Sequence, residues 1–135
     1  MDKFFEQINN VQDILPIIDS LFSDDEKQDK FFESQKQLLF ALIGFLFLEV
    51  PYDEQNLPML SNLLCDMKNY KYSPENGESD TDLLFAHHEY KLANAHKKSK
   101  DANDVVFAYT NAKKLADKDL LIVIDKCLQK IQPNK

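Results

Sequence analysis

The side chains best suited to chemistry in this 135-residue chain are three histidines and two cysteines. Zinc sites hold such residues at short, defined spacings, such as HExxH or paired cysteines two residues apart. His87 and His88 are adjacent and would point about 100° apart on a helix, while His96 follows roughly two turns later. Cys65 and Cys127 each stand alone. We therefore expect no metal site, solvent-facing or rim histidines, and two buried free thiols in a reducing compartment.

Catalysis and phosphate binding have equally little support in the sequence. A phosphate loop such as GxxxxGK[ST] needs several glycines, and the chain contains only Gly44 and Gly77. A nucleophile needs a positioned base, and pairing any two of the 23 acidic residues as acid and base would be arbitrary. We expect no catalytic residues and no cofactor, so that function is carried by the surface.

Charge is distributed unevenly along the chain, whose net charge is −7. Residues 1–35 contain nine acids and three lysines, whereas residues 91–118 contain seven lysines and three acids. A basic face can dock an acidic protein segment or single-stranded DNA, and an acidic face can meet a basic partner; an ordinary solvated surface is the alternative. The candidate partner-contacting residues are Lys97, Lys98, Lys100, Lys113, Lys114, Lys118, Asp24, Asp25, Glu26 and Asp29.

The elements that must position these residues are expected to be helices, because apolar residues recur three and four positions apart and strand-type alternation is missing. Pro58 suits the first turn of a helix, and Ser79 with Asp82 resembles a capping box. A flexible loop is expected at about 68–80, where Asn, Ser, Pro and Gly gather. The expected helices cover about 10–22, 27–50, 57–67, 79–98 and 99–131, the last being one long helix or two stacked pieces.

The run from Leu38 to Leu48 contains no polar side chain. It is too short to cross a membrane, which takes about twenty apolar residues, and no N-terminal targeting segment is visible. A helix that is apolar on every side is surrounded by other helices, and Gly44 within it would let a neighbour approach closely. We therefore predict a single compact all-α bundle of about five to seven helices around a buried central helix at about 30–50. The expected core contains Leu39, Leu42, Ile43, Leu46, Leu60, Leu63, Leu64, Leu84 and Ile124.

Four segments follow one another in a recognisable order: NNVQDILPIIDSLFS at 9–23, DKFFESQKQLLFALIGFLFLEVPYDEQNLPMLSNLL at 29–64, SDTDLLF at 79–85, and YTNAKKLADKDLLIVIDKCLQKI at 109–131. This succession resembles the all-alpha domain of conjugative type IV coupling proteins of the TraG/TraD type, most of all the Gram-positive branch. That family has an aromatic-Glu helix leading into a PxEEQNLPMxxxLL turn, a spacer ending in SxxDxLF, and a helix of the type YxxFKxAAxKT. The family's Lys-Thr pair reads Lys118-Asp119 in this chain.

The resemblance implies a domain that sits on a RecA-like ATPase, faces the cytoplasm and selects substrates for a type IV secretion channel. We accordingly expect residues 1–135 to be one all-alpha domain excised from a larger coupling-protein ATPase at the cytoplasmic membrane. Its implied partners are a relaxase or relaxosome accessory protein and the ATPase domain of the parent chain, with single-stranded DNA as a further candidate and no direct membrane contact. The alternative is a stand-alone helical adaptor or a plasmid-encoded DNA-binding regulator.

Overall fold

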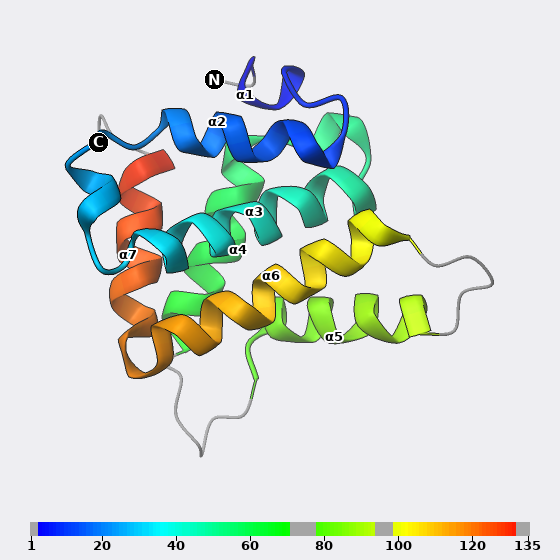
Figure 1. Ribbon diagram of the computed structural model, residues 1–135. Helices are drawn as coiled ribbons and strands as arrows, with labels where there is room; N and C mark the ends of the chain where they lie inside the picture. The colour runs from blue at the N-terminus through cyan, green and yellow to red at the C-terminus, as the bar shows by residue number, and fades with distance from the viewer. Residues whose placement is uncertain (1–2, 71–77, 94–98, 132–135) are drawn as a thin grey trace.

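The computed structural model describes residues 3–70, 78–93 and 99–131, and within these ranges it is helical with no β-strand (Figure 1). The predicted all-α bundle is therefore confirmed. None of the helices within these ranges combines the length and the apolar character needed to cross a membrane. The α-helices are α1 (Lys3–Glu6), α2 (Ile14–Ser20), α3 (Phe32–Glu49), α4 (Leu57–Tyr70), α5 (Asp80–Ala93), α6 (Lys100–Ala116) and α7 (Leu120–Ile131). The same ranges also contain short 3-10 helices, namely η1 (Val11–Asp13), η2 (Glu26–Gln28), η3 (Tyr52–Glu54) and η4 (Asp117–Asp119).

Helix α3 is the centre of the bundle and packs against α2, α4, α6 and α7 (Figure 1). Residues 38–46 are buried on every side of it, as the apolar run predicted. A Cβ built on Gly44 would lie only 2.5 Å from Cγ2 of Val105 on α6. The glycine therefore allows the close approach of α6 that the sequence led us to expect.

The turn between α3 and α4 is closed by side-chain caps. The amide nitrogen of Gln55 donates to the carbonyl oxygens of Phe47 and Val50, at 3.1 and 3.0 Å, and so satisfies the end of α3. The side-chain oxygen of Asn56 accepts from the backbone N–H of Met59 at 2.9 Å and begins α4. Two adjacent residues thus end one helix and start the next.

The last helical segment is two stacked pieces. Helix α6 ends at Ala116 because Asp117 adopts a left-handed backbone conformation with φ of 49°. After the short η4 turn, α7 packs against α4 and α3. Cys127 on α7 is a buried free thiol as expected, whereas Cys65 on α4 is a partly exposed free thiol.

Several boundaries differ from the sequence-based expectation. The first helix, expected at about 10–22, begins with the 3-10 turn η1. The second begins at Phe32 because residues 26–28 form η2 instead. Of the loop expected at about 68–80, residues 68–70 belong to α4 and Asp80 begins α5; residues 71–77 lie outside the described ranges.

Leu84 is the one predicted core residue that the fold places at the surface, with 42% of its area exposed. Helix α5 turns Thr81, Phe85 and His88 toward the bundle, and this face excludes Leu84. The other predicted core residues are buried, namely Leu39, Leu42, Ile43, Leu46, Leu60, Leu63, Leu64 and Ile124.

Candidate functional site

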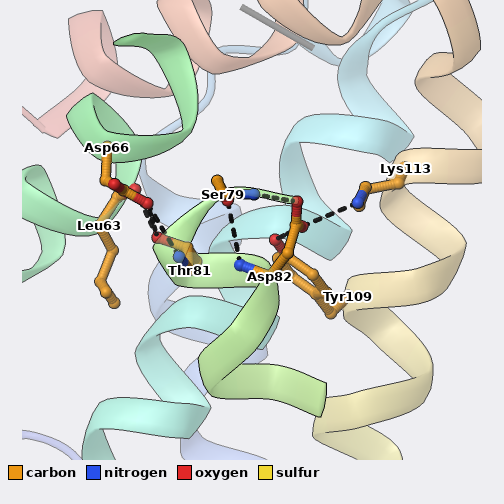
Figure 2. A network of polar contacts seen from close by, with 7 residues as sticks. All are labelled: Leu63, Asp66, Ser79, Thr81, Asp82, Tyr109 and Lys113. Atoms are coloured by element: carbon orange, nitrogen blue, oxygen red, sulfur yellow. Dashed lines mark hydrogen bonds and ion pairs between the residues drawn. The ribbon is translucent and has the colours of Figure 1, made fainter. Parts of the chain in front are cut away.

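A buried polar centre lies where the first turn of α5 meets the last turn of α6 (Figure 2). It begins with the capping box predicted from the sequence. The backbone N–H of Ser79 donates to Oδ2 of Asp82 at 3.0 Å, and the backbone N–H of Asp82 donates to the hydroxyl of Ser79 at 3.0 Å. This reciprocal pair fixes the position of the Asp82 carboxylate.

The second oxygen of Asp82 reaches across to α6. Its Oδ1 accepts from Nζ of Lys113 at 2.8 Å and from the hydroxyl of Tyr109, while the Asp82 side chain is only 4% exposed. Burial alone would raise the pKa of Asp82, but the bonds from Lys113, Tyr109 and Ser79 together hold it below its ordinary value. The carboxylate is therefore charged at neutral pH, and it links α5 to α6. One turn along α5, the ring of Phe85 stacks on Tyr109 with 4.0 Å between ring centroids.

The same turn of α5 is fastened to α4 (Figure 2). The backbone N–H and the hydroxyl of Thr81 both donate to Oδ2 of Asp66, at 2.8 and 2.9 Å. The hydroxyl also lies 3.1 Å from the carbonyl oxygen of Leu63. Asp82 accepts hydrogen bonds from α6, and Thr81 donates hydrogen bonds to α4, so the first turn of α5 is fixed on two sides.

A surface groove of about 440 Å³ runs between α5 and α6 over this polar centre. Its floor is buried and consists of Asp82, Phe85 and Tyr109. The small side chain of Ala86 leaves room on the α5 side, and the remaining lining residues are mostly exposed. We refer to this feature as the α5–α6 groove; besides its floor and Ala86 it is lined by Glu78, Glu89, Val106, Thr110, Lys113 and Lys114.

His88 contradicts the expectation of solvent-facing histidines, because it is only 3% exposed. Its Nδ1 lies 3.5 Å from Oε2 of Glu49, and neither ring nitrogen makes a hydrogen bond with the residues that the structure describes. Burial lowers the pKa of His88, and the Glu49 carboxylate opposes this only in part. His87 is exposed as expected, and His96 lies outside the described residues. The inward face of α5, which also carries Phe85, is the reason that His88 is buried.

The predicted lysines that the structure describes do not form one patch. Lys100 is in the first turn of α6 and pairs with Asp104 at 2.9 Å, whereas Lys113 and Lys114 are in the last turn. Fourteen helical residues separate Lys100 from Lys114, which is about 21 Å along the helix. Lys118 follows on η4 and is exposed. Lys97 and Lys98 lie outside the described residues.

The predicted acidic residues are divided between solvent and α7. Asp24 and Asp25 are exposed. Glu26 accepts a hydrogen bond from Lys130, and Asp29 lies 3.2 Å from Nζ of Lys126. The bond from Lys130 lowers the pKa of Glu26, and the backbone N–H of Phe31, with Lys126, lowers the pKa of Asp29. Part of the charge asymmetry in the sequence is therefore satisfied within the chain itself.

The full polar centre was not predicted from the sequence. The capping box identified Ser79 and Asp82, but not the partners of Asp82 on α6. The available signal was the spacing of Tyr109 and Lys113, which are four residues apart and therefore project from the same face of a helix. No group of three or more His, Cys, Asp or Glu among the described residues is placed to hold a metal ion.

Comparison with known proteins found no family model, no curated protein and no solved structure that matches this chain.

Proposed function

We propose that this chain is a substrate-docking domain of a conjugative type IV coupling protein, which binds a relaxase or relaxosome accessory protein during DNA transfer. The observation that carries the proposal is a contact in the folded protein between two of the sequence segments on which the resemblance rests. Asp82 and Phe85 belong to SDTDLLF, and Tyr109 and Lys113 belong to YTNAKK. Asp82 bonds to Tyr109 and Lys113 across α5 and α6 (Figure 2). The ring of Phe85 stacks on that of Tyr109.

A third segment supports the same proposal. Gln55 and Asn56 belong to PYDEQNLP, and they cap the end of α3 and the beginning of α4. These motif residues therefore have a structural role in this fold, and this supports the proposal. Because the side chains of Gln55 and Asn56 stabilise the fold, we expect other residues on the exposed surface to contact the substrate.

Protein docking is favoured over DNA binding by the arrangement of charge. Lys100 and Lys113 are already paired with Asp104 and Asp82, and the remaining described lysine candidates stand at one end of α6. Neutralising a phosphate backbone requires several unpaired cations along a common track. In this proposal the chain itself turns over no nucleotide, and the ATPase of the parent protein supplies the energy of transfer.

Binding of the purified chain to the relaxase and to the accessory proteins encoded by the same genetic element tests the proposal. We expect saturable one-to-one binding to at least one of them by biolayer interferometry, and none to a relaxase from an unrelated element. Binding to single-stranded DNA alone, with affinity falling steeply between about 50 and 200 mM salt, would instead support a DNA-binding adaptor.

A further inference from the structure

We propose that the α5–α6 groove binds an amphipathic helix of a partner protein. The inference deepens the proposed function, since it names the surface on which a relaxosome protein would dock, and it rests on that function for the identity of the partner.

The first support is the shape of the groove. Helices α5 and α6 contact each other and run in opposite directions (Figure 1). Side chains from both helices form the walls of the groove. Phe85 and Tyr109 give it a rigid aromatic floor, and Ala86 opens the wall opposite Val106. A volume of about 440 Å³ that is open to solvent suits the side chains along one face of a partner helix, as in helix-in-groove recognition.

The second support is a set of large apolar side chains that extend the walls outward. Leu83 and Tyr90 on α5 are 53% and 68% exposed, and Phe107 on α6 is 68% exposed. Residues 83, 86 and 90 fall within an arc of roughly 60° on α5, so Leu83 and Tyr90 stand beside Ala86. Phe107 lies about 60° around α6 from Thr110, which lines the other wall. Exposed apolar residues gathered beside a groove are typical of protein interaction sites.

The third support is charge, which differs between the two walls. On the α5 wall, Glu78 and Glu89 form no ion pair with any residue that the structure describes. On the α6 wall the same holds for Lys114. A complementary helix therefore carries basic residues along the edge that faces α5 and acidic residues along the edge that faces Lys114. The two carboxylates disfavour a nucleic-acid strand in this groove.

The probe for this inference is a synthetic helical peptide of about 18 residues, which is roughly five turns. Leucines at i, i+3, i+4 and i+7 form its apolar face, with lysines on one flank and glutamates on the other. It is titrated into the whole ¹⁵N-labelled chain and followed by NMR. We expect shift changes confined to residues 78–90 and 106–114. Changes elsewhere, or no binding up to about 1 mM, would overturn the inference.

Two arginine variants, both at exposed positions, test the location of binding. Ala86→Arg fills the groove from an exposed position and should weaken peptide binding about tenfold or more. Leu115→Arg is also on an exposed position, on the flank of α6 outside the groove, and should leave the affinity unchanged. Equal effects of the two substitutions would contradict the placement, provided that both proteins retain the wild-type circular dichroism spectrum.

Peptide charge and self-association give further outcomes. Peptides with lysine on both flanks, or glutamate on both, should bind less tightly than the two-sign peptide; equal binding would remove the charge argument. If the chain itself dimerises at high concentration, and Ala86→Arg abolishes the dimer, the occupant is a second copy and the inference is wrong.

The inference and the proposed function fail in different ways. If a relaxosome protein binds the wild-type chain and the Ala86→Arg variant equally well, the docking surface lies elsewhere and the proposed function stands. If the peptide binds in the groove but no relaxosome protein binds the chain, the groove is still a helix-binding site and the proposed function is wrong.

Discussion

Nζ of Lys113 lies 2.8 Å from Oδ1 of Asp82, so an ion pair joins residues 31 positions apart in the sequence. The two partners differ in burial, because the Lys113 side chain is 33% exposed and that of Asp82 only 4%. Removing the lysine therefore leaves a buried carboxylate with less compensation, whereas removing the carboxylate leaves an ammonium that can reach water. The pair fixes the crossing of α5 and α6, and with it the floor of the α5–α6 groove.

Replacing Lys113 with methionine should lower the free energy of unfolding by about 2–4 kcal/mol, because a buried charge loses its partner. Urea unfolding at neutral pH, followed by circular dichroism, measures the change. The matched control is Lys100→Met, which breaks an exposed pair with Asp104 and should cost much less, because both charges remain in water. Similar losses of stability in the two variants would show that the ion pair between α5 and α6 stabilises the protein no more than an exposed pair does.

Replacing Gly44 with alanine should destabilise the protein, although alanine favours a helix by about 1 kcal/mol over glycine. The added Cβ would meet Cγ2 of Val105 at 2.5 Å in the buried contact between α3 and α6, and overpacking of a core costs about 1–3 kcal/mol. Thermal and urea unfolding give the sign of the change.

A double-mutant cycle identifies the cause of that loss. Val105→Ala removes the methyl group that the new Cβ would strike, so the double variant should show a favourable coupling of at least about 1 kcal/mol. Additive effects of the two substitutions would place the strain elsewhere.

The burial of the central helix α3 could be predicted from its amino-acid composition alone. Every residue from Leu38 to Leu46 is apolar, so any helical packing hides them. Helix α5 lacks such a pattern, since Asp82 and His88 are polar and buried while Leu84 is apolar and exposed. Its orientation is decided by tertiary partners on α4 and α6, which local periodicity does not encode.

The candidate site shows the same limit. Sequence grouped Lys100 with Lys113 because both fall in one basic segment, but the length of α6 places them at opposite ends. The sequence also suggested Glu26 as a partner-contacting residue, whereas its carboxylate accepts a hydrogen bond from Lys130 near the other end of the chain. The contact between Glu26 and Lys130 depends on how helices remote in sequence pack together, which local sequence patterns do not encode.

The stability of the protein should fall on mild acidification because of His88. Its pKa in the folded state lies below the ordinary value of 6.5, chiefly through burial, so the unfolded chain takes up the proton first. The contribution of neutral His88 to the free energy of unfolding is complete above pH 6.5. It is lost progressively as the pH falls from 6.5 toward the folded-state pKa. The charged groups that bear on the ring are Glu49, which opposes the shift, and Lys91 and His87, which add to it.

Free energies of unfolding at about pH 7.5 and pH 5.5 measure the effect. His88→Leu should reduce the pH dependence, because it removes the titrating ring from its contact with Phe45 and Glu49. His87→Gln, at the exposed neighbouring position, should retain most of it. A pH dependence that disappears in the His87 variant and persists in the His88 variant would reverse the assignment.

The two thiols should differ in reactivity in the folded protein. Cys127 is fully buried on α7, and burial raises the pKa of its thiol far above the ordinary value, so the reactive thiolate is scarce. Cys65 on α4 is partly exposed and accessible to reagent. A colorimetric thiol assay should therefore label one cysteine per native chain rapidly and the second only after unfolding in urea. The Cys65→Ser variant should lose the rapid phase. Rapid labelling of that variant under native conditions would mean that the packing of α7 against α3 and α4 opens readily, and it would contradict a buried position for Cys127.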